Sequence, residues 1–161
     1  MALDTTIGAA TAVSYATEAE YIAYAAAMGW TLSGDNEVNL RQAAKALDAN
    51  NSFVGVTQYQ FQARAWPRLW TGLVRGWSID PDTIPQPIKD AQCEMAYLIQ
   101  GGADPLATID GLVKRKREKL DVIEEETEYF GGQGKPSYPA VTRLLRGYII
   151  GGPGQAAMVR G

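Results

Sequence analysis

The chain has 161 residues, of which 46% are hydrophobic and 20% are charged, and it carries a formal net charge of -3 with an isoelectric point near 5.0. This composition is typical of one soluble globular domain, and a chain of this length buries about two thirds of its unfolded surface without a disulfide or a metal. The mild acidity argues against a protein whose main work is to hold phosphates, because such proteins carry a surplus of lysine and arginine.

The histidine and cysteine content argues against an enzyme. The chain has no histidine, the commonest general base and a common metal ligand, and its single cysteine, Cys93, has no partner for an internal disulfide. We therefore expect no catalytic residue, no metal site, no cofactor and no enzymatic activity. Residues 1–4 carry no lysine or arginine, and the apolar run 21–34 is short and mixed, so we also expect no signal peptide and no transmembrane helix.

The first predicted helix begins at Thr17, which forms a capping box with Glu20. Its alanine-rich body covers residues 21–28, and Gly29 is a suitable end. A second helix follows the loop at 33–35, with its buried face at i, i+3, i+4 and i+7: Leu40, Ala43, Ala44 and Leu47. Asparagine tolerates the left-handed conformation, so the pair at 50–51 is expected to end this helix in that way.

Residues 53–77 are irregular and rich in aromatic and arginine side chains. They contain Phe53, Tyr59, Phe61, Trp66, Trp70 and Trp77, interleaved with Arg64, Arg68 and Arg75. Aromatic rings beside guanidinium groups are what single-strand DNA binding uses. The interpretation we favour is that the rings fill the core, while the arginines stack on them or pair with carbonyls and carboxylates. Because Pro67 favours an extended backbone at Trp66, we interpret Trp66, Pro67 and Arg68 as a structural anchor.

A third helix follows the proline-rich turn at 80–87. One apolar face is expected from four residues: Ile88, Ala91, Met95 and Ile99. Gly101 and Gly102 close the helix. Cys93 lies about 140° from Ile88 on this helix, which predicts a position off the main apolar stripe.

Residues 112–130 change abruptly from basic to acidic. The cations are Lys114, Arg115, Lys116, Arg117 and Lys119, and the carboxylates are Asp121, Glu124, Glu125, Glu126 and Glu128. The pattern leaves both a helix and a pair of strands open. A solvated charged face is the simplest interpretation for a monomer. A metal site is disfavoured, because successive glutamates point in different directions and no calcium-loop spacing is present.

The C-terminal part begins with a glycine-rich linker at 131–137, after which Ser137 is expected to cap a short helix. Val141, Leu144, Leu145 and Tyr148 keep helical spacing. Residues 150–161 are expected to form a flexible tail. The predicted partner-docking residues of this part are Tyr148, Ile149, Ile150, Met158 and Val159.

The order of several short motifs resembles a known family. These motifs are Ser14-Tyr15, Thr17 to Tyr21, Gln62 to Arg68, Ile84-Pro85, the helical run from Ile88 to Ile99, and Tyr138 to Val141. Their arrangement is similar to that of the small head-tail connector (adaptor) proteins of tailed bacteriophages, whose members are often labelled DnaT-like single-stranded DNA binding proteins. The resemblance implies an extended segment or β-hairpin at 112–130.

We therefore expect a mainly α fold: a small helical bundle in residues 1–149, with a charged ribbon or β-hairpin and a flexible C-terminal arm at 150–161. The resemblance implies a structural virion protein that forms a ring, with twelve copies, between the portal and the tail. Its expected partners are other copies of the chain, the portal protein, the next neck or tail component, and genomic DNA passing through the lumen without sequence-specific binding. The expected location is the neck of the virion, and the host cytoplasm during assembly, with no membrane partner.

The charged segment gains a role in such a ring, because a basic and an acidic patch on each subunit meet in a repeated head-to-tail contact. The candidate intersubunit residues are Lys114, Arg115, Lys116, Arg117, Glu124, Glu125, Glu126 and Glu128. The alternative function is a DnaT-like replication protein that binds single-stranded DNA through the aromatic and arginine residues of 66–77.

Overall fold

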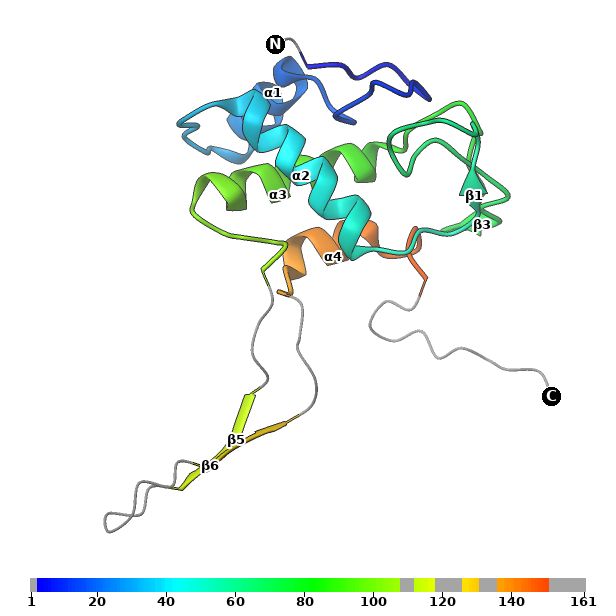
Figure 1. The fold of residues 1–161 in the computed structure, drawn as a ribbon. Coiled ribbons are helices and arrows are strands. Elements are labelled where there is room, and N and C mark those ends of the chain that lie inside the picture. The colour runs from blue at the N-terminus through cyan, green and yellow to red at the C-terminus, as the bar shows by residue number, and fades with distance from the viewer. Residues whose placement is uncertain (1–2, 108–111, 118–125, 131–135, 151–161) are drawn as a thin grey trace, which may run out of the picture. The chain divides into compact units, whose positions relative to one another are not determined.

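The computed structural model describes residues 3–107, 112–117, 126–130 and 136–150 (Figure 1). The chain divides into two compact units, one formed by Met1–Ala103 with Tyr138–Gly161 and the other by Asp104–Ser137. The expectation of a mainly helical fold with small antiparallel sheets is confirmed.

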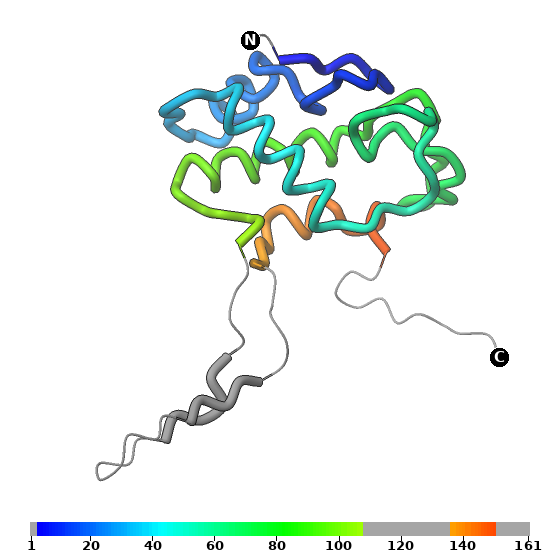
Figure 2. The backbone as a smooth tube through the Cα atoms, viewed as in Figure 1, coloured from blue at the N-terminus to red at the C-terminus, as the bar shows by residue number. Residues whose placement is uncertain are grey.

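The first unit contains the four helices of the described residues. They are α1 (Glu18–Met28), α2 (Asn36–Asn50), α3 (Gln86–Gln100) and α4 (Pro139–Leu145). Helix α3 contacts each of the other three, most extensively α2 and α4 (Figure 2). The core therefore forms around α3. None of the helices in the described ranges combines the length and apolar character needed to cross a membrane.

The ends of α1 are as predicted. The backbone N–H of Thr17 donates to Glu20 Oε2 at 2.7 Å, and the N–H of Glu20 donates to Thr17 Oγ1 at 3.2 Å, which completes the capping box. Gly29 ends the helix in the left-handed conformation, with φ 71°. A residue without a Cβ adopts this conformation at little cost.

Helix α2 buries the four predicted residues and also Ala46. Its N-cap is Asp35, whose carboxylate accepts the N–H of Val38 at 3.0 Å. The predicted left-handed end at 50–51 is wrong, because Asn51 is extended with φ -122°. Its side-chain amide instead donates to the carbonyl of Leu47 at 2.9 Å, which gives one carbonyl of the last turn a hydrogen-bond partner.

Helix α3 buries Ile88, Ala91 and Met95 as predicted. The prediction that Cys93 lies off the buried face is wrong, because the cysteine is 2% exposed. Gln92 is also fully buried. Since α2, α4 and the segment before α1 all pack near α3, its buried surface is much wider than one apolar stripe.

Helix α4 begins differently from the prediction. Its N-cap is Tyr138, without a side-chain hydrogen bond, so Ser137 does not cap the helix. Pro139 occupies the first turn, where its missing N–H costs nothing. Val141 and Leu145 are buried against the core.

Two short antiparallel pairs of strands connect α2 to α3. Strand β1 (Val56–Thr57) pairs with β2 (Arg68–Leu69), and β3 (Leu73–Val74) pairs with β4 (Trp77–Ser78). The turn between β3 and β4 has positive φ at both Arg75 (52°) and Gly76 (85°), as two-residue hairpin turns require. Figure 1 shows these strands together on one side of the helical core.

The second unit contains the hairpin of β5 (Leu112–Arg117) and β6 (Glu126–Phe130). The strands are antiparallel, so the extended structure predicted for 112–130 is confirmed at 112–117 and 126–130, while 118–125 lie outside the described residues. The register places Arg115 opposite Glu128 and Arg117 opposite Glu126, and it shifts between Val113 and Arg115. The linker residues 131–135 lie outside the described residues.

The chain after α4 returns to the start of residues 53–77, which we call the aromatic segment. Ile149 forms a bridge with Phe53, and the N–H of Ile150 donates to the carbonyl of Ser52 at 2.7 Å. Tyr148 and Ile149 are 8% and 7% exposed and belong to the core, which corrects their predicted place in a docking tail. Ile150 is exposed, while Met158 and Val159 lie outside the described residues.

Candidate nucleic-acid interface

Large apolar side chains are exposed in the segment between α2 and α3. We use the name aromatic surface for Phe61, Trp70, Leu73 and Trp77, whose exposed fractions are 74%, 83%, 73% and 78%. The prediction that the rings of 53–77 fill the core is therefore wrong for these three aromatic residues and for Tyr59, which is 43% exposed, and it is confirmed for Phe53 and Trp66. Several large exposed apolar side chains within 17 residues of one segment make this segment a candidate binding surface.

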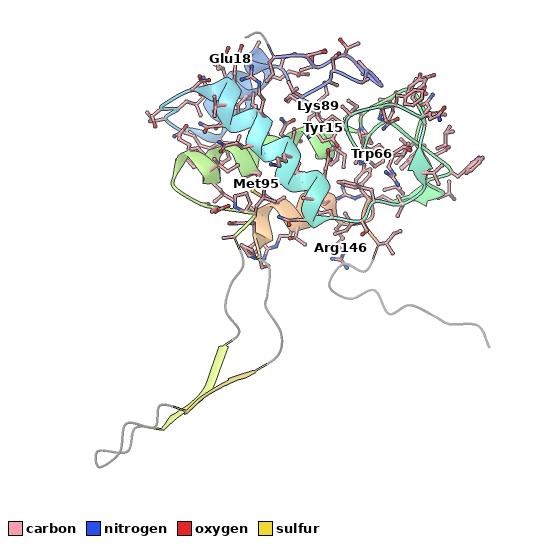
Figure 3. All side chains as sticks on the ribbon, viewed as in Figure 1. Tyr15, Glu18, Trp66, Lys89, Met95 and Arg146 are labelled. Atoms are coloured by element: carbon pink, nitrogen blue, oxygen red, sulfur yellow. The ribbon has the colours of Figure 1, made fainter. Side chains whose placement is uncertain are left out.

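Trp66 joins this segment to the core. Its ring is 1% exposed, and the residue is labelled in Figure 3. The ring meets those of Phe53 and Tyr148 edge to face, each at a centroid distance of 5.9 Å. Pro67, which follows through a cis peptide bond, is fully buried as well. The two residues thus hold one end of β2 against the core.

Arg68 holds the segment together through the backbone. Its Nε donates to the carbonyl of Val54 at 2.7 Å, Nη1 donates to Ala65 at 2.9 Å, and Nη2 donates to Gly55 at 2.7 Å and to Phe53 at 3.3 Å. A guanidinium group has five N–H donors in a planar fork, so one side chain satisfies carbonyls from the segment just before β1 and from the loop before β2. The role of Arg68 is therefore internal.

Arg64 also makes an internal contact, an ion pair with Asp48 of α2. Its Nη1 lies 3.2 Å from Asp48 Oδ2, and the same carboxylate accepts the hydroxyl of Tyr15. That hydroxyl accepts the N–H of Ala65 at 3.0 Å. Burial raises the pKa of Asp48, although the hydrogen bond from Tyr15 and the charge of Arg64 act in the opposite direction. The network attaches the aromatic segment to α2 and to the segment before α1.

Two other arginines lie at the surface near β3. Arg75 is exposed and sits over the ring of Tyr148, with Cζ 5.9 Å from the centroid. A Cβ added at Gly147 would lie 3.4 Å from Val74 Cγ1 and 3.9 Å from Arg75 Cγ, so the turn after α4 packs against β3. Arg146, exposed and adjacent to Gly147, is therefore a second cation in this region. Arg75 lies between Leu73 and Trp77 in sequence, and Arg146 directly precedes the glycine that packs against β3.

The backbone that presents Trp70 is constrained. Trp70 has φ 53°, a left-handed conformation that is rare for a bulky side chain. Gly55 approaches this part of the chain so closely that an added Cβ would lie 2.1 Å from the carbonyl oxygen of Leu69. Residues in such conformations occur preferentially at functional sites. The constraint holds the Trp70 ring in solvent and not in the core.

The Tyr59 end of the segment is acidic. Asp82 accepts the hydroxyl of Tyr59 at 2.8 Å and the amide of Gln58 at 2.6 Å. The hydrogen bond to Asp82 raises the pKa of Tyr59. This end of the segment therefore carries negative charge and would repel a phosphate group.

The described residues offer little for catalysis. They contain no group of three or more histidine, cysteine, aspartate or glutamate side chains placed to hold a metal ion. Burial raises the pKa of Cys93 to about 12, so its thiol is protonated at neutral pH and is a poor nucleophile.

The predicted intersubunit residues lie mostly in β5 and β6. The structure brings four of them together within one chain, as the register pairs Arg115 with Glu128 and Arg117 with Glu126. Lys116 is opposite Thr127, and Lys114 falls where the register shifts. Glu124 and Glu125 lie outside the described residues.

Sequence reasoning found the aromatic segment but missed which rings are exposed. One signal was available, since Arg75-Gly76 between two short apolar runs is typical of a tight hairpin turn, and a hairpin of this length leaves side chains in solvent. Arg146 gave no such signal, because it is distant in sequence and approaches β3 only through the tertiary fold.

Comparison with known families gives one match over the entire chain. The model of the family described as "Putative DnaT-like ssDNA binding protein" matches residues 1–161. Comparisons with curated proteins and with solved structures gave no significant match. The protein belongs to this DnaT-like family.

Proposed function

We propose that the protein binds single-stranded DNA through its aromatic surface. The observation that carries the proposal is the exposure of Phe61, Trp70 and Trp77 on a segment that Trp66 and Arg68 hold rigidly against the core. Every base has a π face, so exposed rings bind single strands with little dependence on sequence. The description of the family supports the same ligand.

In this proposal, stacking supplies most of the affinity. Stacking of a base on an aromatic side chain contributes about 1–3 kcal/mol per base. Arg75 and Arg146 would neutralise backbone phosphates on the side away from Asp82. Since the chain is acidic overall and Arg64 and Arg68 are used internally, few phosphates are contacted.

We expect Trp70→Ala combined with Trp77→Ala to weaken binding of a fluorescently labelled oligo(dT) by about 30-fold or more, because two stacking platforms are lost. Fluorescence anisotropy measures the affinity. The matched control is Ile22→Ala with Met28→Ala, which removes two half-exposed apolar side chains from α1. This control should bind as the unaltered protein does.

The same titration at several salt concentrations tests the role of the arginines. Two phosphate contacts predict that the logarithm of the binding constant falls with the logarithm of salt concentration with a slope of about -1.4. If the protein does not bind oligo(dT) at low salt, or if the tryptophan variant binds as well as the control, the proposal is wrong.

A second candidate function is a head-tail connector subunit of a tailed bacteriophage. One observation favours it: the separate unit Asp104–Ser137 carries a hairpin with one basic and one acidic strand, which suits repeated contacts between copies. In this candidate the aromatic surface would contact the portal protein or the next neck or tail component. Genomic DNA would pass through a ring, of twelve copies by resemblance, without specific binding.

Electron microscopy of lysates from a phage that lacks this gene separates the two candidates. The connector function predicts unjoined heads and free tails. Single-stranded DNA binding in replication predicts failed DNA synthesis and few filled heads. Joined virions in normal numbers would exclude the connector function.

A further inference from the structure

The β5–β6 hairpin has two unpaired edges. Within the described ranges it forms a two-stranded sheet without a third strand, in a unit separate from the helical core. A two-stranded hairpin is at best marginally stable alone in water, and independent stability needs three or more strands with a hydrophobic face, or packing against a helix. Its free N–H and C=O groups are a template for another strand. An additional strand beside either edge would therefore stabilise the unit.

The charges of β5 and β6 determine which kind of third strand each edge of the hairpin can pair with. Strand β5 contains four consecutive cations, Lys114 to Arg117, and β6 contains Glu126 and Glu128. Two of the cations have acidic partners in the register, whereas Lys116 is opposite Thr127 and Lys114 lies at the shift. Directly opposed unlike charges stabilise a sheet by about 0.2–1 kcal/mol per pair, and like charges destabilise it. An acidic strand is favoured beside β5, and a basic strand beside β6.

A second copy of the chain supplies both strands. Two-fold symmetric pairing would place β5 beside β5, or β6 beside β6, and would bring like charges together. Placing β6 of one copy beside β5 of the next brings unlike charges together and continues the antiparallel order. Such a contact is heterologous, so it leaves a free β5 edge at one end and a free β6 edge at the other.

We propose that copies of this protein associate head to tail by strand addition, with β6 of one copy pairing with β5 of the next. The contact repeats and gives a ring if the rotation closes, or a filament if it does not. The inference is independent of DNA binding by the aromatic surface, and it specifies the intersubunit contact that the connector candidate requires.

Single-cysteine variants test the pairing in the full chain. One variant carries Lys116→Cys in β5 and the other carries Thr127→Cys in β6, both with Cys93→Ala. A short bismaleimide then links only different molecules, because each chain has one thiol. We expect the mixture of variants to give at least about five-fold more linked dimer than either variant alone, as about 1 kcal/mol of charge preference implies. Equal or greater linking within one variant would overturn the proposal.

Charge reversal provides a second test. Lys114→Glu with Lys116→Glu changes the two cations that lack an acidic register partner and leaves the Arg115–Glu128 and Arg117–Glu126 positions intact. We expect the mass from light scattering to fall toward that of a monomer, with unchanged helical content by circular dichroism. The control, Lys45→Glu with Arg143→Glu, reverses two exposed charges on α2 and α4 and should leave the mass unchanged.

Unaltered protein that is monomeric at all concentrations, or a double reversal that leaves the assembly intact, would overturn the inference. Neither result would affect the proposed DNA binding, because the hairpin contains no residue of the aromatic surface. Oligo(dT) affinity measured on the same variants therefore distinguishes failure of this inference from failure of the proposed function.

Discussion

Replacing Gln92 with leucine is expected to lower the free energy of unfolding by about 4 kcal/mol, because it leaves several buried polar groups without partners. Gln92 is fully buried at the centre of α3. Its Oε1 accepts the N–H groups of Tyr15 and Ala16, each at 2.9 Å. Its Nε2 donates to Ser14 Oγ at 2.6 Å and to the carbonyl of Leu40 at 2.8 Å.

These four bonds join α3 to α2 and to the segment before α1. Leucine has a similar size, so the predicted loss comes from unsatisfied polar groups and not from a cavity. Gln92→Glu keeps the acceptor but ionises when the pH rises, so we expect it to be more stable in acid than at neutral pH.

Urea denaturation followed by tryptophan fluorescence measures the effect. The matched control is Gln42→Leu on the exposed face of α2, for which we expect a change within about 0.5 kcal/mol. A loss below 1 kcal/mol for Gln92→Leu, close to that of the control, would show that these hydrogen bonds do not hold the core together.

The second large effect is expected at Arg68. Arg68→Lys keeps the charge but replaces a planar fork by a single ammonium group, which cannot reach carbonyls both in the segment just before β1 and in the loop before β2. Because buried carbonyls lose donors, we expect a loss of about 2–4 kcal/mol in stability. The aromatic surface should lose its order, so binding of oligo(dT) should fall even at temperatures where the helices remain folded.

The matched control is Arg75→Lys, an exposed arginine in the same segment. We expect it to keep normal stability and most of its binding. Thermal denaturation and fluorescence anisotropy on both variants separate the two roles. If Arg68→Lys were as stable as the control and bound equally well, Arg68 would not organise this surface.

Local chemistry made much of the helical fold predictable. The capping box at Thr17 and the left-handed Gly29 are decided by neighbouring residues, and the apolar spacing of α2 is visible within one helix. The hairpin at 112–130 was not decided locally, because its charges suit a helix or strands equally well. Only the resemblance to connector proteins favoured strands there.

The buried face of α3 was harder to predict because its partners are distant in sequence. Gln92 is polar and lies between apolar residues, and its partner Tyr15 is 77 positions away. The helical wheel placed Cys93 off the main apolar stripe, yet the residue is buried because α3 is surrounded on several sides. Periodicity in one helix does not reveal how many neighbours pack around it.

The aromatic segment shows the same limit. Trp66 and Trp70 are four residues apart in one irregular stretch, but one ring is buried and the other is in solvent. The difference arises from the contacts of Trp66 with Phe53 and Tyr148 and from the left-handed backbone at Trp70. Neither can be read from residue types, so the general tendency of aromatic residues to be buried gave the wrong answer for Trp70.

The most direct test of the proposed function is an NMR titration with oligo(dT) that follows the indole N–H signals of the four tryptophans. Trp70 and Trp77 are exposed, Trp66 is buried, and Trp30 stacks on Tyr97 at 4.1 Å outside the aromatic segment. We predict that the Trp70 and Trp77 signals move with a common saturation curve while those of Trp30 and Trp66 stay in place. Unchanged Trp70 and Trp77 signals at high oligonucleotide concentration would contradict the account.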